Sequence, residues 1–424
     1  MGESERIAPQ DWMTAPATRR VMSAFADAGV EARFVGGCVR DALLGRPVTD
    51  IDIATPAPPE RATEILEAAG IAVHPTGVRH GTVTAVADHR PFEITTLRRD
   101  VETFGRHARV EFTDDWQADA ARRDFTMNAI SCGPDGALFD YFGGIGDARA
   151  GRVRFVGKPE DRIREDVLRL LRLFRFQAHY GREKLDADAL AAAEKMAPEL
   201  ATLSGERVRN ETLRLLLAPD PLPVLTLMRE RGVMRHFLAE ADRPGRLAAL
   251  VALESALPRD LVAGADAIRR LASLIGGGTG AAQSVAERFR LSNEERDRLL
   301  ALASFEPLTG DLPSRTGRRR LYAEGAALYR DRTLLSWADE IAAGRLASRI
   351  DAQYWQAQLR EAATWHAPSL PVRGADALAL GVAPGPRVGE LIGAVERWWI
   401  DGDFRADRDS CLAKLRELAA DGRR

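Results

Sequence analysis

The sequence contains little cysteine and no cysteine pattern typical of a metal site. Its three cysteines, Cys38, Cys132 and Cys411, lie far apart in a chain of 424 residues. No cysteine pair or cysteine–histidine cluster has zinc spacing, and three distant cysteines do not make a disulfide scaffold. Such sparse use of cysteine is typical of a reducing compartment, so we expect a cytoplasmic protein.

Long apolar segments are also missing. The sequence begins MGESERIAPQDW, which carries acidic residues and no apolar stretch, and this argues against a signal peptide. No run of about 18 apolar residues occurs, so we expect no membrane span. Low-complexity segments and repeats of fixed period are absent too.

An excess of charge of one sign is the third absence. The chain has 60 basic and 62 acidic residues and a formal net charge of −2, which excludes a histone-like nucleic-acid binder. The charge is nevertheless unevenly spread. Residues 151–184 contain ten basic and five acidic side chains, a local charge of +5. Such a local basic track suits a phosphodiester partner.

The texture of the sequence changes along the chain. Residues 20–150 combine short β-branched runs with glycine-rich turns, and a helix is predicted to begin at Pro59 and to end at Gly70. From about residue 159 the strand signal nearly vanishes, and Ala, Leu, Arg and Glu dominate between Gly/Pro breaks. We therefore predict an α+β chain: a head with a small mixed β-sheet, followed by an elongated all-α part.

The first candidate site lies in the stretch GGCVRDALLGRPVTDIDIAT. Gly36 and Gly37 follow a predicted strand and precede a predicted helix, where glycine lets the backbone approach a ligand and the helix N-terminus favours anions. Arg40 lies one turn into that helix and can reach a phosphate with its planar fork. The alternative is an ordinary turn with no ligand.

The same stretch ends in two closely spaced aspartates. Asp50 and Asp52 are two apart in a strand-like segment, so we expect both side chains on one face. Two carboxylates so close repel each other unless a cation lies between them, and Mg²⁺ prefers such oxygen ligands and can bridge them to a triphosphate. An edge strand or a capped turn is the alternative, but the glycines and Arg40 just upstream favour a metal site.

A second candidate is the segment DAARRDFTMNAISC. Its adjacent Arg122 and Arg123, followed by Asp124, are compatible with a surface cluster of ion pairs. In the functional interpretation Arg123 clamps a phosphate or a sugar, while the Asn128 amide both donates and accepts hydrogen bonds.

The third candidate is EDRIREDVLRLLRLFRFQAHYG, which we interpret as one strong helix. Asp166, Arg169, Arg172 and Arg175 recur every three residues along it. A solvated face of ion pairs is the alternative, although arginine at every step favours planar recognition. A carboxylate accepts from an exocyclic amine and a guanidinium donates to a ring nitrogen or carbonyl oxygen. Such a pair reads cytosine and adenine and rejects uracil and guanine.

The three segments together carry a family resemblance. They contain Gly-Gly-x-Val-Arg-Asp-x-Leu-Leu-Gly followed by Asp-x-Asp, Arg-Arg-Asp-Phe-Thr-x-Asn-Ala, and Glu-Asp-x-x-Arg-x-x-Arg-x-x-Arg-Phe. They resemble the polymerase-beta-type nucleotidyltransferases, and within them the bacterial class II family of CCA-adding tRNA nucleotidyltransferases and poly(A) polymerases. The resemblance is specific over residues 33–176 and extends to 374–404.

This resemblance implies a division of the chain and a set of site residues. The breaks in the sequence near residues 150, 220 and 350 give the bounds of these parts. They are a catalytic nucleotidyltransferase head at 20–150, a helical neck with the nucleotide-selecting helix at 151–220, a helical body at 221–350 and a tRNA-binding tail at 351–424. Asp50 and Asp52 are implied to be catalytic and to hold Mg²⁺. Independently of the resemblance, Glu93 in a strand-like segment is a candidate for the third carboxylate that commonly completes a two-metal site. The nucleotide-binding residues implied are Gly37, Arg40, Arg123, Asp166, Arg169, Arg172 and Arg175.

The implied activity is template-independent addition of C, C and A to the 3′ end of tRNA. CTP and ATP would be the substrates, the acceptor arm of tRNA the partner, and pyrophosphate the leaving product of a two-metal transfer. No obligatory protein partner and no membrane partner is expected. Three alternatives remain: a poly(A) polymerase, a relative that adds only CC or only A, and a non-catalytic RNA-binding protein.

Overall fold

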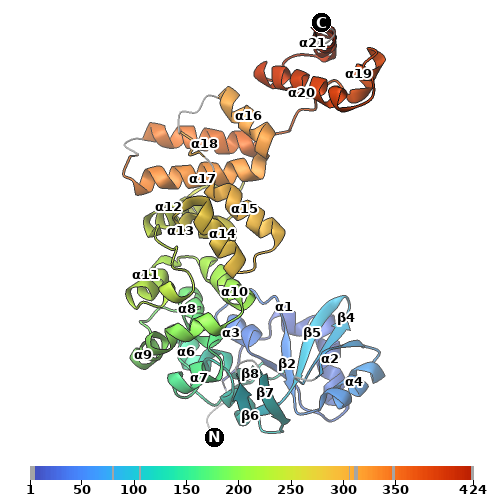
Figure 1. Ribbon diagram of the computed structural model, residues 1–424. Helices are drawn as coiled ribbons and strands as arrows, with labels where there is room; N and C mark the ends of the chain where they lie inside the picture. Colours follow the sequence, from blue (N-terminus) through green and yellow to red (C-terminus); the bar gives the residue numbers. More distant parts are fainter. Residues whose placement is uncertain are drawn as a thin grey trace. The chain divides into compact units, whose positions relative to one another are not determined.

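A computed structural model describes residues 5–78, 81–104, 107–304, 306–309, 314–345 and 349–421. The chain divides into two compact units, Met1–Ala239 and Glu240–Arg424. Figure 1 shows that the strands belong to the first unit, and within the described residues no strand follows Leu138–Asp140. This confirms the predicted α+β class. The finer division into head, neck, body and tail stays a prediction.

The strands are short and all precede residue 141. They are β1 (Arg33–Val35), β2 (Asp52–Thr55), β3 (Ala72–Gly77), β4 (Thr82–Ala87), β5 (Arg90–Thr96), β6 (Arg98–Phe104), β7 (His107–Phe112), β8 (Ile130–Cys132) and β9 (Leu138–Asp140).

In the first unit, helices are interspersed among the strands along the sequence as far as β9, and only helices follow β9 in the residues described. The helices of this unit are α1 (Asp11–Thr14), α2 (Pro16–Asp27), α3 (Gly37–Leu43), α4 (Pro59–Ala68), α5 (Trp116–Ala121), η2 (Thr126–Asn128), α6 (Gly144–Ala150), α7 (Pro159–Glu165), α8 (Leu168–Tyr180), α9 (Ala187–Met196), η3 (Ala197–Thr202), α10 (Gly205–Leu216), α11 (Leu222–Glu230) and η4 (Met234–His236).

The described residues of the second unit form helices. These are α12 (Pro244–Ala256), α13 (Ala267–Leu274), α14 (Gly278–Arg288), α15 (Asn293–Ala303), α16 (Ser314–Glu324), α17 (Ala326–Ala342), α18 (Arg349–Thr364), α19 (Gly374–Ala379), α20 (Pro386–Asp401) and α21 (Arg408–Asp421). None of the helices described is both long and apolar enough to cross a membrane.

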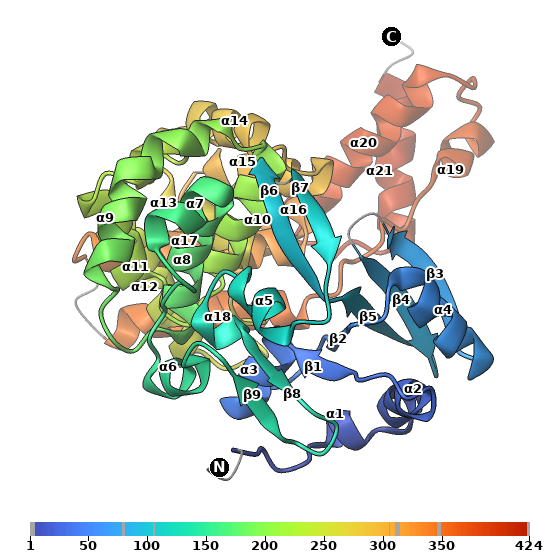
Figure 2. The ribbon, with the colours of Figure 1, turned by 90° about the horizontal axis from the view of Figure 1, so that it is seen from below.

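The main sheet has seven strands in the order β3-β4-β5-β2-β1-β8-β9. It is mixed, as predicted, because β2 and β5 run parallel while the other neighbouring pairs are antiparallel. In the parallel pair Asp52 lies opposite Glu93, and Ile53 lies opposite Ile94. Strands β6 and β7 form a separate two-stranded sheet, which Figure 2 shows beside the main one.

One face of the main sheet is buried under helices, and the other carries Asp52 and Glu93 beside a small apolar cluster of Val35, Ala54, Leu97 and Trp116. Helix α4 packs on β3, β4 and β5, and α2 packs on β4 (Figure 2). Ile53 and Ile94 point into this core and are at most 1% exposed. Because side chains alternate along a strand, Asp52 and Glu93 must point to the opposite face. Burial of the apolar face therefore fixes where the carboxylates stand.

The helix predicted over residues 160–180 is two helices, and the prediction of a single helix is wrong. Helix α7 ends at Glu165 and α8 begins at Leu168. Asp166 between them has an extended backbone, with φ −154° and ψ 108°. Its carboxylate accepts a hydrogen bond of 3.1 Å from the Leu168 N–H. Aspartate competes in this way with the helical backbone hydrogen bonds, which explains the break.

Candidate active site

A pair of carboxylates faces each other across β2 and β5. Asp52 is half-buried, and Glu93 opposite it is exposed. Asp50 was predicted on the same strand, but β2 begins only at Asp52, so Asp50 precedes the strand and is exposed. Burial raises the pKa of Asp52 to about 6, Glu93 and Asp50 add to the rise, and the Arg123 guanidinium opposes it. A carboxylate in such surroundings is stabilised in its charged form by a nearby cation.

The turn before α3 brings the backbone close to this carboxylate. Gly36 has φ +73° and ψ −125°, a conformation that residues with a side chain avoid. A Cβ atom at Gly36 would lie 3.1 Å from Nη1 of Arg123 and 3.9 Å from Oδ2 of Asp52. Gly36 therefore leaves room between the backbone, a cation and a carboxylate. Gly36 and Asp52 of the first candidate segment therefore lie close to Arg123 of the second.

Arg123 is held in place by an aspartate that sequence reasoning missed. Asp119 on α5 is 3% exposed and accepts from Arg122 Nε at 2.8 Å and from Arg123 Nη2 at 3.2 Å. Burial alone would raise the pKa of Asp119, but the two guanidiniums lower it below its ordinary value. Asp119 precedes the arginines by three and four residues, the spacing of neighbours on a helix, and that signal was available in the sequence.

Arg40, in the middle of α3, is buried among polar and aromatic groups. It makes a two-point ion pair with Asp41, through Nε at 3.0 Å and Nη2 at 2.8 Å, and its Nη1 donates to Oδ1 of Asn128 at 2.6 Å. Its guanidinium carbon lies 4.3 Å from the ring centroid of Tyr180, a cation–π distance. Gly37 is in close contact with the same side chain, because a Cβ atom at Gly37 would lie 3.7 Å from Arg40 Nη2.

Asn128 connects Arg40 to helix α8 through Asp124. Its Nδ2 donates to Oδ1 of Asp124 at 2.9 Å, and Arg172 Nε donates to Oδ2 of Asp124 at 2.8 Å. Burial would raise the pKa of Asp124, but Arg172, Asn128 and the Phe125 N–H together lower it. A chain of hydrogen bonds therefore runs from Arg40 to Arg172.

Arg175 extends the same network to α10. Its Nε donates to Oε2 of Glu211 at 2.5 Å, and Arg172 Nη1 lies 3.7 Å from Oε1 of that glutamate. Glu211 is 5% exposed and was not predicted as a site residue. Both arginines are thus paired with carboxylates of this chain, as the alternative of a face of ion pairs also expects, although Arg175 and the carboxylates are largely buried.

Asp166 and Arg169 lie at the corner between α7 and α8. The Arg169 N–H donates to the Asp166 carbonyl at 2.9 Å, but their side chains have different partners. Asp166 pairs with Arg207 of α10, while Arg169 pairs with Glu165. Arg169 Nη2 also donates to the carbonyl of Arg122 at 3.2 Å, so this corner touches the segment that carries Arg123.

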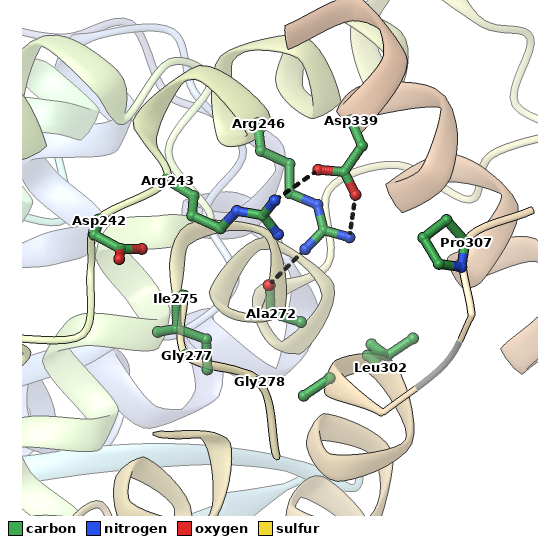
Figure 3. A pocket seen from close by; sticks show the side chains of 12 residues that line it. Asp242, Arg243, Arg246, Ala272, Ile275, Gly277, Gly278, Leu302, Pro307 and Asp339 are labelled. Carbon is green, nitrogen blue, oxygen red and sulfur yellow. Dashed lines mark hydrogen bonds and ion pairs between the residues drawn. The ribbon is translucent and has the colours of Figure 1, made fainter. Parts of the chain in front are cut away.

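A polar cavity elsewhere contains none of the predicted site residues. It measures about 440 Å³ and lies in the second unit, between α12, the start of α14 and α17. Figure 3 shows Arg243 and Arg246 both turned toward Asp339, at 3.2 and 2.9 Å. Because Asp339 and Asp242 in the lining balance the charges of the two arginines, the cavity has no excess charge that would attract a nucleotide.

Except for Asp50, which precedes β2, the predicted residues fall into three groups in the first unit, with Gly37 beside Arg40. Asp52 and Arg123 meet at Gly36, with Glu93 opposite Asp52. Arg40, Arg172 and Arg175 are linked through Asn128, Asp124 and Glu211, while Asp166 and Arg169 form the helix corner. Among the residues described, no three His, Cys, Asp or Glu side chains converge as a preformed metal cluster. The roles assigned to the individual residues remain predictions.

Comparison with known proteins gives these groups a context. Residues 32–154 match the family model "Poly A polymerase head domain", and residues 184–243 match "Probable RNA and SrmB- binding site of polymerase A". The first match includes Asp52, Glu93 and Arg123, and it also includes Arg40 with its partner Asn128.

Relatives resemble the chain over nearly its whole length. The mitochondrial CCA tRNA nucleotidyltransferase 1 of Mus musculus is 34% identical over 93% of this chain and 88% of its own. The CCA-adding enzyme of Limosilactobacillus fermentum is 30% identical over 94% of this chain and 96% of its own. The crystal structure of the Bacillus stearothermophilus CCA-adding enzyme in complex with CTP matches with a TM-score of 0.74 and 28% identity, covering 97% of this chain and 99% of that one. The chain therefore belongs to the family of CCA-adding tRNA nucleotidyltransferases.

Proposed function

We propose that this chain adds C, C and A to the 3′ end of tRNA without a template, using CTP and ATP and releasing pyrophosphate. The observation that carries the proposal is the meeting of Asp52, Arg123 and Gly36 opposite Glu93. It is supported by relatives of that printed name, at 30% identity or more over most of both chains.

We propose that Asp50 and Asp52 hold Mg²⁺, with Glu93 as the candidate third carboxylate. Asp52 fits such an ion because its charged form is disfavoured by burial and by the carboxylates near it. Carboxylate oxygens are the ligands that Mg²⁺ prefers, and triphosphate oxygens would complete the shell. When bound, two such ions would activate the terminal 3′-hydroxyl and stabilise the pyrophosphate that leaves.

The remaining groups supply binding and orientation. Arg123, aimed by Asp119, lies beside Asp52 and is proposed to hold the triphosphate. Gly37 and Arg40 are proposed to do so from α3. Asp166 and Arg169 would choose the base, with Arg172 and Arg175 as further nucleotide contacts that also stiffen the neck through Asp124 and Glu211.

The tRNA is proposed to bind along the helical parts of the chain. The excess of basic residues at 151–184 suits the phosphates of an acceptor arm, and the proposed tail, 351–424, would bind tRNA as well. We also propose that the protein acts in the cytoplasm without an obligatory protein partner. Its three cysteines are buried free thiols, which is the form expected in a reducing compartment.

The proposal is tested with three tRNA transcripts, ending at the discriminator base, at C and at CC. Each is incubated with the protein, Mg²⁺ and CTP, ATP or both, and the products are resolved to the nucleotide. Addition that stops at CCA on the shortest transcript is the expected result. Long A tails would make the chain a poly(A) polymerase, and a stop at CC or activity on CC ends alone would make it a partial-function relative. No incorporation would favour a non-catalytic RNA-binding protein.

A further inference from the structure

We propose that Arg207 is a positioning residue for base selection, because it fixes the carboxylate of Asp166 in the orientation that accepts the amine of cytosine or adenine. The inference rests on the proposed function and extends it to a residue outside the three predicted segments. Arg207 lies in the first turn of α10, whereas Asp166 lies 41 residues earlier, at the corner between α7 and α8.

The ion pair holds both oxygens of Asp166 from one side. A single nitrogen of Arg207, Nη2, lies 2.7 Å from Oδ2 and 3.0 Å from Oδ1. The Leu168 N–H holds Oδ1 from the α8 side at 3.1 Å. Because donors from both α8 and α10 hold it, the Asp166 carboxylate cannot rotate freely about its Cβ–Cγ bond.

One acceptor position remains for a ligand. A carboxylate offers about four lone-pair positions, and the three hydrogen bonds above use both positions of Oδ1 and one of Oδ2. The second position of Oδ2 is therefore open to an exocyclic amine. It is also reachable, because the Asp166 side chain is 22% exposed and borders a cavity of about 290 Å³. That cavity is lined by Arg164, Asp166, Val167, Thr202, Leu203, Ser204 and Arg207.

Orientation matters more for rejecting a wrong base than for binding the right one. Uracil and guanine present a carbonyl oxygen where cytosine and adenine present an amine, so a fixed carboxylate repels them. A carboxylate without Arg207 could turn away from that oxygen and remove the repulsion. Arg169 does not replace Arg207 in this role, since its own guanidinium is paired with Glu165.

A purely structural role explains the pair less well. The side chains of Arg207 and Asp166 are 24% and 22% exposed, and ion pairs within reach of solvent contribute little to folding stability. The connection between α8 and α10 is already made by the more deeply buried pair of Arg175 and Glu211, which are 12% and 6% exposed. The effect of Arg207 is therefore expected in nucleotide choice.

The test compares Arg207→Gln and Arg207→Lys with the matched control Arg209→Gln. Arg209 lies two positions further along α10, so its side chain leaves the helix in a different direction, and its Nε hydrogen-bonds the Asn210 side chain. For each protein, kcat and KM are measured for CTP and for UTP on a tRNA ending at the discriminator base. The ratio of the two kcat/KM values does not depend on the fraction of protein that is folded.

We expect Arg207→Gln to raise KM for CTP and to lower the CTP-over-UTP ratio about tenfold, the factor for one misplaced charge-assisted hydrogen bond. Affinity for tRNA should stay unchanged. Arg207→Lys should recover part of the ratio, because both hydrogen bonds come from one nitrogen that an ammonium can replace. Arg209→Gln should match the wild type.

Two results would overturn the inference. One is an unchanged ratio in Arg207→Gln, and the other is a lysine variant that discriminates no better than the glutamine variant. Both require a wild-type protein that adds CTP and rejects UTP, so they are distinct from a failure of the proposed function, in which the wild type itself adds no CTP.

Discussion

Asp52 on β2 lies directly opposite Glu93 on the parallel strand β5. Both stand on the face of the sheet that points away from the main core, because Ile53 and Ile94 beside them fill that core. Two strands 41 residues apart in the chain thus bring together two carboxylates that no local pattern connects. Burial is the main cause of the raised pKa of Asp52, and the charge of Glu93 is the next largest. The position of Glu93 beside Asp52 also supports the proposal that it is a third metal carboxylate.

The first prediction concerns these carboxylates. Asp52→Asn should lower nucleotide transfer by at least about 100-fold, because it removes a ligand of the proposed metal, while tRNA binding stays within twofold. Glu93→Gln should lower transfer less and should raise the Mg²⁺ concentration needed for half-maximal rate. Single-turnover rates and a tRNA gel-shift assay measure the two effects. A fully active Asp52→Asn protein would contradict the metal role.

The second prediction uses two glycines that flank α3. Gly36→Ala should destabilise the protein by about 1–3 kcal/mol through its positive φ, and it should also raise KM for the nucleotide, because the new Cβ would press on Arg123. Gly45→Ala is the matched control. Its φ is +65°, but nothing lies within 4 Å of its added Cβ. Steady-state kinetics should show the change in KM for Gly36→Ala alone, whereas thermal melting should show a loss in both variants.

The third prediction is a pH dependence of stability. The pKa of Asp124 is lowered in the folded protein, so its charge stabilises the fold above the unfolded pKa of about 3.9, and this stabilisation is lost as the pH falls through the lower folded pKa. Asp124→Asn should therefore cost about 3 kcal/mol near pH 7, where it leaves Arg172 without that partner. The difference from wild type should shrink below about pH 4.

Thermal melting across this pH range measures the difference. The exposed Asp27→Asn serves as control and should stay within about 0.5 kcal/mol of wild type at every pH. A cost of Asp124→Asn that grows as the pH falls would show that the sign of this argument is wrong.

The fourth prediction concerns the residues proposed to choose the base. Exchanging Asp166 and Arg169 would place a guanidinium beside Arg207 and a carboxylate beside Glu165, so like charges would meet on both sides of the helix corner. Base choice should then loosen, with UTP and GTP incorporated at rates within about tenfold of CTP and ATP. Competition assays with all four nucleotides measure this, and an unchanged preference for CTP and ATP would count against the assignment.

The class of fold was predicted from the sequence because it depends on local patterns. The choice of the three candidate segments depends on local patterns too, and the roles of their residues stay predictions. Strand alternation, the glycines before α3 and the break from strands to helices are visible within short windows. A helix was predicted to begin at Pro59 and to end at Gly70, and the structure has it at Pro59–Ala68, with φ +69° at Gly70.

Long-range partners were beyond such reasoning. Arg207 is 41 residues from Asp166, and Glu211 is 36 residues from Arg175, so only the packing of α10 on α8 brings them together. The break at Asp166 was missed for a related reason. The arginine repeat is helical in its spacing, and the cap that interrupts it depends on one side chain that bonds to the Leu168 N–H.

Competition among all four nucleotides shows both which bases the protein adds and where it stops. A tRNA transcript ending at the discriminator base is incubated with the protein, Mg²⁺ and equal concentrations of all four nucleoside triphosphates, and the 3′ ends of the products are sequenced. The account predicts that products end in CCA, without U or G and without further growth. Products that contain U or G, that grow into long tails, or that never form would contradict it.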